Sequence, residues 1–227
     1  MKVIRSEKPD NAARTALKEA LAGDVSTLFL SSGGSCIGLL TSEILPHDCS
    51  KLTVSVLDEH YIEDESDRNF EKLRKAAFFV AATERGAGSF DPYGGAVEEA
   101  GYRFERFLKE WLNTRPRGRL VCTVGIGADG HTMGIVPFTE REAFAHLFQT
   151  DGTLAVGYRT TYGPYPQRLT STFPLLKRAD DVILYATGAE KRDALCRILG
   201  EERPLHELPA QYLTRLPQAV LLTDQPI

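Results

Sequence analysis

A glycine-rich segment places a histidine two residues after an aspartate, in the run Gly125-Ile126-Gly127-Ala128-Asp129-Gly130-His131-Thr132. Glycines at this density are typical of a backbone path that side chains would obstruct. An imidazole can take up a proton near neutral pH, and a neighbouring carboxylate can set its tautomer. The pattern therefore favours His131 as a general base oriented by Asp129. A buried structural histidine would account for the same residues, so this segment alone leaves the choice open.

A second glycine segment, Ser31-Ser32-Gly33-Gly34-Ser35, follows an apolar run and precedes an expected helix. Paired glycines let the backbone approach a ligand closely, and the free N–H groups at a helix start attract anions. We interpret Ser32, Gly33, Gly34 and Ser35 as a candidate phosphate-binding loop. The alternative is a tight strand-to-helix turn with Ser35 as its cap.

An acidic segment, Asp58-Glu59-His60, follows another apolar run. Carboxylates at the end of a strand can orient a hydroxyl-rich substrate or act as bases. Asp58 and His60 are therefore candidate substrate-binding residues. A solvated loop in which Asp58 accepts backbone N–H groups is an equally good interpretation.

Two cations are also placed where they could hold an anion. Arg168 follows a segment containing Gly163, Pro164 and Pro166, and its guanidinium offers a fork suited to phosphate or carboxylate. Lys191 lies at the start of an expected helix, where the first turn already carries a positive end. A lysine at that position is consistent with anion binding, although a surface lysine is common.

Short apolar runs alternate with amphipathic stretches along the chain, as expected for a parallel sheet covered by helices. We predict a three-layer α/β fold, in which a mostly parallel, Rossmann-like sheet has helices on both faces. Ligands of such sheets bind beyond the carboxyl ends of the strands, so we expect the candidate segments to meet at one edge. The predicted strands are Thr27 to Leu30, Thr53 to Leu57, Leu120 to Val124, Leu154 to Gly157, Val182 to Ala186 and Ala219 to Leu222. The predicted helices are Asn11 to Ala22, Ser35 to Leu45, Asn69 to Phe79, Val97 to Leu112, Ala189 to Leu199 and Pro209 to Leu213.

The bulk properties narrow the class of protein. A length of 227 residues fits one α/β domain over residues 1–227, with room for a small subdomain around 135–170. A net charge of −4 without a Lys/Arg run argues against a nucleic-acid partner. The four cysteines form no C-x-x-C pair, and no apolar run reaches the ~20 residues that span a bilayer, so we expect a cytoplasmic protein with no membrane partner. No Cys/His cluster has metal-ligand spacing and no G-x-S-x-G segment occurs, so we expect neither a metal site nor a serine nucleophile of that kind.

These segments together resemble the 6-phosphogluconolactonases, within the larger group that includes the glucosamine-6-phosphate deaminases, and the resemblance covers nearly the whole chain. Gly125 to Pro137, G-I-G-A-D-G-H-T-M-G-I-V-P, is similar to the family's G-x-G-x-D-G-H-T-A-S-L-F-P. Gln167 to Pro174, Q-R-L-T-S-T-F-P, is similar to its R-I-T-L-T-L-P. The deaminases carry an acidic F-N-E-P after D-G-H, whereas Gly134 to Pro137 contains no acid, which favours the lactonase branch. Weaker matches are Ser32 to Ser35 with the first loop, Asp58-Glu59 with an Asp-Glu-Arg segment, Asn69 with a following Asn, and Thr187 to Lys191 with a Gly-x-x-Lys.

The resemblance implies a cofactor-free hydrolase of a phosphorylated sugar δ-lactone, 6-phosphoglucono-δ-lactone of the pentose phosphate pathway. His131 would activate the attacking water, and Asp129 would orient the imidazole or pin the glycine loop. Arg168 and Lys191 would hold the phosphate, and the Gly33-Gly34 loop would bind either the phosphate or the developing oxyanion. The expected partner is a small phosphosugar, and the expected assembly is a monomer or a small homo-oligomer.

The sequence also departs from the family pattern. His60 stands where the family carries Arg, Ile62-Glu63 replace Val-Pro, and Met133-Gly134 replace a small pair. Since that Arg is expected to help bind anionic groups, its replacement leaves two alternatives open. One is a glucosamine-6-phosphate deaminase or isomerase, in which Asp58 would move a proton at carbon while His131 aids ring opening. The other is a non-catalytic sugar-phosphate-binding protein.

Overall fold

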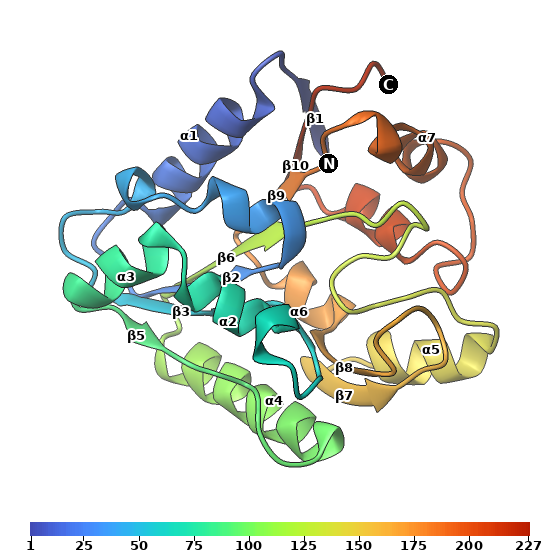
Figure 1. Ribbon diagram of the computed structural model, residues 1–227, viewed down its shortest axis with the longest axis horizontal. Helices are drawn as coiled ribbons and strands as arrows, with labels where there is room; N and C mark the ends of the chain where they lie inside the picture. Colours follow the sequence, from blue (N-terminus) through green and yellow to red (C-terminus); the bar gives the residue numbers. More distant parts are fainter.

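A parallel sheet of seven strands forms the middle layer of the computed structural model, which describes residues 1–227 (Figure 1). The central strands are buried because their runs of Leu, Val and Phe face helices on both sides. The three-layer α/β fold predicted above is confirmed. In spatial order the strands are β1 (Lys2–Arg5), β10 (Ala219–Thr223), β9 (Asp181–Tyr185), β6 (Arg119–Val124), β2 (Thr27–Ser31), β3 (Leu52–Val56) and β5 (Gly88–Ser89).

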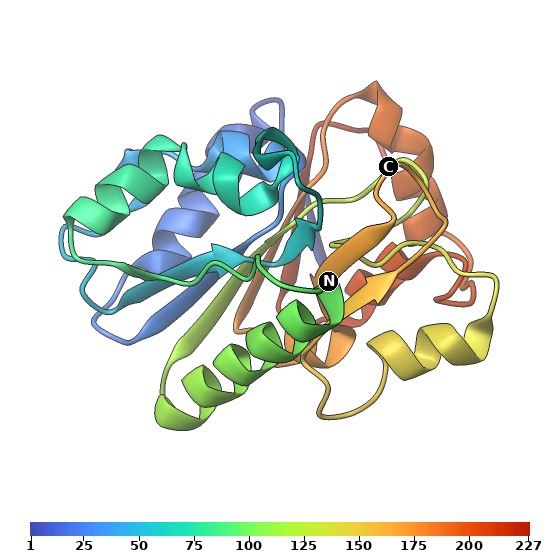
Figure 2. The same cartoon turned by 60° about the horizontal axis from the view of Figure 1, so that its bottom comes forward.

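Helices cover both faces of this sheet, as Figure 2 shows. On one face, α1 (Pro9–Leu21), α2 (Asn69–Arg74) and α3 (Ala77–Glu84) pack Leu17, Phe70 and Phe78 into a core cluster of 20 buried residues. A larger cluster of 38 buried residues fills the opposite face. The helices on that face are α4 (Val97–Thr114), α5 (Arg141–Phe148), α6 (Phe173–Lys177) and α7 (Arg192–Leu199). No helix of the chain combines the length and the apolar character needed to cross a membrane.

A second, antiparallel sheet of three strands lies beside the first. Its order is β4 (Asp58–His60), β8 (Gln167–Ser171) and β7 (Ala155–Arg159). Only Leu57 separates β3 from β4, and it joins the two sheets, because its N–H donates to Ser31 O and its carbonyl accepts from Ser171 N. Leu57 therefore fixes Asp58, the first residue of the small sheet, close to the large sheet.

The small sheet corrects two expectations. The strand predicted at Leu154 to Gly157 does form, but it belongs to the antiparallel sheet, where its backbone at Gly157 lies against Gly101 of α4. Asp58 to His60 is a strand rather than a loop, since it pairs with Gln167–Ser171. An apolar run predicts a strand but does not identify its partner.

Two predicted helices are interrupted. Ser35 to Leu45 forms two 3-10 helices, Gly34–Leu39 and Ser42–Ile44, separated at Thr41, which has extended backbone. Asn69 to Phe79 divides into α2 and α3 at Ala76, which is also extended. Alanine favours helix intrinsically, so packing of Phe70 and Phe78 into the same core overrides the local preference there.

The other helices agree with prediction to different degrees. Val97 to Leu112 is confirmed as α4, and Asn11 to Ala22 as α1. The predicted helix Ala189 to Leu199 begins with a 3-10 turn, Ala189–Lys191, which precedes α7. The predicted helix Pro209 to Leu213 is a 3-10 helix, Pro209–Arg215. Helices α5 and α6 and strands β1, β4, β5 and β8 were not predicted.

Candidate active site

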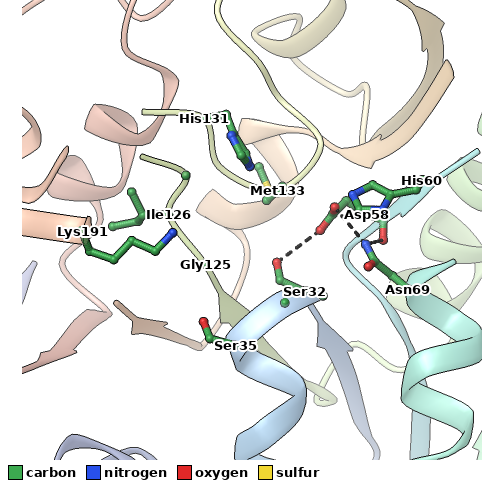
Figure 3. Close-up of a pocket in the computed structure, with 13 residues that line it drawn as sticks. Ser32, Ser35, Asp58, His60, Asn69, Gly125, Ile126, His131, Met133 and Lys191 are labelled. Carbon is green, nitrogen blue, oxygen red and sulfur yellow. Dashed lines mark hydrogen bonds between the residues drawn. The ribbon is translucent and has the colours of Figure 1, made fainter. Parts of the chain in front are cut away.

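A cavity of about 270 Å³ opens at the carboxyl ends of β2, β3, β6 and β9. The side chains of His131, Asp58 and Lys191 project into it from three separate segments, as Figure 3 shows. Eight residues proposed from sequence line its wall: Ser32, Gly33, Gly34, Ser35, Asp58, His60, His131 and Lys191. The cavity therefore brings together most of the candidate segments at one sheet edge.

Asp129 lies behind His131 rather than on the cavity wall. Its Oδ1 atom is 2.6 Å from His131 Nδ1 and also accepts the backbone N–H of His131 at 3.1 Å. Burial of Asp129 opposes ionisation, but the hydrogen bonds and charge of His131 hold the pKa of this carboxyl well below its usual range. Because an ionised carboxylate only accepts, Nδ1–H of His131 is the donor in this contact, and Nε2 is the ring nitrogen that remains for a reacting group.

The glycine loop is shaped by the space that these two side chains occupy. A Cβ atom on Gly127 would overlap both the His131 ring and the Asp129 carboxylate. Gly130 has φ +94°, and Met133 is the single non-glycine residue with positive φ, at +53°. Hydrogen bonds from Gly127 N to His131 O and from Gly130 N to Gly127 O close the loop. The sequence places glycine where the backbone needs it, and Met133 keeps a strained conformation on the cavity wall.

Asp58 is buried on the opposite side of the cavity. Its Oδ1 accepts from Ser32 Oγ at 3.2 Å, and its Oδ2 and backbone carbonyl accept from Asn69 Nδ2. Burial raises the pKa of Asp58 to about 6, against the opposing effects of His131 and Arg168. Asp58 can therefore exchange a proton near neutral pH.

Glu59 points away from the cavity and has a structural role. Its carboxyl group accepts the N–H groups of Asn69 and Phe70 at the start of α2, and its burial raises its pKa to about 8. This cap places Asn69 against Asp58, and a Cβ on Gly33 would overlap the Asn69 amide. Asn69 is therefore part of the site, although residue types alone did not identify it as a candidate.

Lys191 is the one lysine or arginine on the cavity wall. It ends the 3-10 turn Ala189–Lys191, whose preceding residue, Gly188, has φ +92°. The Gly188 N–H donates to both carboxylate oxygens of Asp224, at 3.1 and 3.2 Å, which anchors the turn to the end of β10. The ammonium group makes no ion pair within the protein and is free to meet an anion in the cavity.

Arg168 lies next to the cavity without lining it. It is only 5% exposed, and its Nε has no hydrogen-bond partner. Its neighbours are His60, which faces it across strands β4 and β8, and Tyr165, whose ring centre is 5.7 Å from the guanidinium carbon. Arg168 forms no salt bridge, although its charge lowers the pKa of Asp58, so an anion that approached the guanidinium would offset the solvation lost on burial.

The sequence matches the family of glucosamine-6-phosphate isomerases and 6-phosphogluconolactonases over residues 7–221. The chain belongs to this family. A 6-phosphogluconolactonase from Synechocystis sp. is 32% identical over 208 residues, which cover 88% of this chain and 82% of that protein. A glucosamine-6-phosphate deaminase from Streptococcus thermophilus is 29% identical over 92% of this chain and 89% of that protein.

Solved structures agree with the fold of this family. A 6-phosphogluconolactonase from Shewanella baltica superposes with a TM-score of 0.78, at 18% identity, over 98% of this chain and 95% of that one. A monomeric glucosamine-6-phosphate deaminase superposes with a TM-score of 0.66, at 20% identity, over 99% of this chain and 98% of that one. Both branches of the family share the fold, so the residues of the cavity must distinguish their reactions.

Proposed function

We propose that the chain hydrolyses the δ-lactone of a phosphorylated sugar acid, converting 6-phosphoglucono-δ-lactone to 6-phosphogluconate in the pentose phosphate pathway. The observation that carries this proposal is the contact of 2.6 Å between Asp129 Oδ1 and Nδ1 of His131, a residue that lines the cavity, because it leaves Nε2 as the ring nitrogen available to a substrate. The 32% identical relative with the lactonase name supports the same reaction.

The His131 ring can perform both proton transfers of this hydrolysis. Nε2 takes a proton from water as the water oxygen attacks the lactone carbonyl. The bond from carbonyl carbon to ring oxygen then breaks, and the proton returns from His131 to that oxygen, which becomes a hydroxyl group. Asp129 stays ionised throughout and stabilises the transient imidazolium. Water is the only co-reactant, so the proposed reaction needs no cofactor.

The phosphate would be held by the two cations at the site. Lys191 faces the cavity with a free ammonium group, and the buried Arg168 has an Nε atom without a hydrogen-bond partner. A charge-assisted hydrogen bond to either is worth about 1.5–3 kcal/mol. The Gly33-Gly34 loop lines the same cavity, and its backbone N–H groups would bind the phosphate or the oxyanion formed at the carbonyl.

Deamination of an amino-sugar phosphate is the second candidate function. It is favoured by Asp58, which faces the cavity and has its pKa raised to about 6 by burial, as a base for proton transfer at carbon requires. The segment Gly134 to Pro137 contains no acid, which weighs against it. We rank lactone hydrolysis first for that reason.

A substrate panel tests these proposals together. The chain is assayed for turnover of 6-phosphoglucono-δ-lactone, with spontaneous hydrolysis subtracted, and for ammonia release from glucosamine 6-phosphate. Lactone turnover without ammonia release is expected. Ammonia release would replace the proposal by deamination, and thermal stabilisation by both compounds with turnover of neither would identify a binding protein.

The state of the cysteines bears on where in the cell the enzyme acts. All four cysteines are unpaired, and three of them are buried, which is consistent with a reducing cytoplasm. We propose a cytoplasmic enzyme that acts on a small phosphosugar as a monomer or small homo-oligomer. Light scattering of the purified chain would determine the assembly.

A further inference from the structure

His60 lines the cavity at the position where the family resemblance leads us to expect an arginine, and two contacts fix its ring. Its Nδ1 lies 3.1 Å from the backbone carbonyl oxygen of Asp67. Its face stacks on the Tyr165 ring, with centres 3.8 Å apart and an interplanar angle of 12°. Its strand partner is Arg168. The ring therefore has one orientation and a defined set of neighbours.

The contact with Asp67 determines where His60 carries its proton. A carbonyl oxygen only accepts hydrogen bonds, so Nδ1 must be the N–H donor. The same carbonyl accepts from Lys72 Nζ at 3.1 Å. A second proton on Nε2 would create a cation that Lys72 and Arg168 repel and the Asp67 carboxylate attracts. Burial, with those two cations, lowers the pKa of His60 to about 4, so the ring is neutral under physiological conditions.

The remaining nitrogen, Nε2, is then a hydrogen-bond acceptor without a partner in the protein. His60 and Asp58 both line the cavity. Nε2 of His60 is not fully buried, so a ligand can reach it. A lone pair on a neutral ring repels phosphate oxygens and attracts hydroxyl groups. The position therefore suits the polyol part of a sugar rather than its phosphate.

We propose that His60 is a specificity-determining residue, whose Nε2 accepts a hydrogen bond from one hydroxyl group of the bound sugar phosphate. This inference rests on the proposed function, because it concerns the substrate of the same cavity. It leaves phosphate binding to Lys191 and Arg168. An arginine at this position would be a donor only, so the His60 site discriminates by hydroxyl position where an arginine would discriminate by charge.

The test pairs substitutions at His60 with substrates that lack single hydroxyl groups. His60→Phe keeps a flat ring on Tyr165 and removes the acceptor, and His60→Gln restores an acceptor oxygen. The substrates are 6-phosphoglucono-δ-lactone and its 2-, 3- and 4-deoxy forms. One neutral hydrogen bond corresponds to about a 2- to 12-fold effect. We expect His60→Phe to lower kcat/KM for the parent lactone by that factor, and by less than twofold for the one deoxy lactone that lacks the contacted hydroxyl.

Binding measurements separate this inference from the proposed reaction. The Kd values of 6-phosphogluconate, its deoxy forms and inorganic phosphate are measured by calorimetry, which needs no turnover. We expect His60→Phe to weaken 6-phosphogluconate but not inorganic phosphate, and His60→Gln to recover part of the loss. His47→Phe, at an exposed position outside the cavity, is the matched control.

Two results would overturn the inference. One is an equal loss for the parent and all deoxy compounds in His60→Phe, and the other is weaker binding of inorganic phosphate. Thermal melting confirms that each variant is folded. Absence of lactone turnover in the unsubstituted chain would instead refute the proposed function and leave the binding result to decide the role of His60.

Discussion

Replacement of Asp129 by Asn tests how the carboxylate supports His131. A single oxygen, Oδ1, accepts from both the backbone N–H and the ring Nδ1 of His131. An amide nitrogen cannot accept the backbone N–H, so in Asp129→Asn the amide oxygen must keep this position. The ring then still donates from Nδ1, and its tautomer is retained. Only the negative charge beside the imidazole is lost.

The size of the effect follows from that geometry. A hydrogen bond to a charged group is worth about 1.5–3 kcal/mol, and a neutral one about 0.5–1.5 kcal/mol. The difference, about 1–2 kcal/mol, predicts a 5- to 30-fold fall in kcat for Asp129→Asn. A wrong tautomer would instead cost about 10⁴-fold. Both groups are about one-third exposed, which favours the lower part of the predicted range.

The assay couples 6-phosphogluconate formation to its oxidative decarboxylation and follows NADPH absorbance. Spontaneous lactone hydrolysis is measured in the same buffer and subtracted. A fall of more than a thousandfold would show that the tautomer changes and that the Oδ1 argument is wrong. A fall of less than twofold would show that Asp129 only pins the glycine loop.

Three further predictions concern residues around the cavity. Arg168→Met should raise KM for the phosphorylated lactone about 10- to 100-fold, yet raise the Tm of the free protein, because it removes a buried charge that forms no salt bridge. Lys191→Met should raise KM without raising Tm, and a lower Tm in Arg168→Met would contradict this account. Asp224→Ala should raise KM about threefold to tenfold and leave kcat within twofold, because it releases the Gly188 turn that carries Lys191. A fall in kcat as large as the rise in KM would assign Asp224 another role. The pKa of Glu59 is raised from 4.5 to about 8 in the folded protein, so its contribution to stability is complete below pH 4.5 and is lost as pH rises through 8. In urea unfolding, Glu59→Gln should therefore lose less free energy of unfolding between pH 5 and pH 8.5 than the unsubstituted chain. Equal losses would be evidence against a buried neutral Glu59.

The large sheet was predictable because its strands are short apolar runs. Thr27–Ser31 and Arg119–Val124 are buried along almost their whole length, and burial on both faces selects the Leu, Val and Phe that make such runs visible. The small sheet was predicted only at Leu154 to Gly157, and its strand Asp58–His60 was missed because it is polar and three residues long. Its strand character comes from pairing with Gln167–Ser171, more than a hundred residues away, which no local pattern contains.

The candidate site was predictable where chemistry and backbone geometry coincide. The family resemblance to the 6-phosphogluconolactonases is confirmed by the family match. Gly127 is needed for room beside His131, so its presence indicates the loop. Met133 on the cavity wall has no such indication, because an apolar residue with positive φ is visible only in three dimensions.

Contacts between strands determine the features of Arg168 and His60 that the sequence did not predict. The burial of Arg168 without a partner, and its separation from the cavity wall, depend on how β8 pairs with β4. The neutral state of His60 depends on Asp67 and Tyr165, which approach it from outside its own strand. The sequence identified His60 as a departure from the family pattern. The structure supplies the contacts with Asp67 and Tyr165 from which we infer that the ring is a hydrogen-bond acceptor.

The rate of lactone hydrolysis by His131→Ala is the measurement that tests the central claim most directly. The variant removes the nitrogen that would take the proton from water while leaving Lys191 and Arg168 in place. A general base contributes about 10²–10⁴-fold, so kcat should fall at least tenfold while the Kd of 6-phosphogluconate stays within about threefold. A kcat within twofold of the unsubstituted chain, after subtraction of spontaneous hydrolysis, would contradict the assignment of His131 as the base.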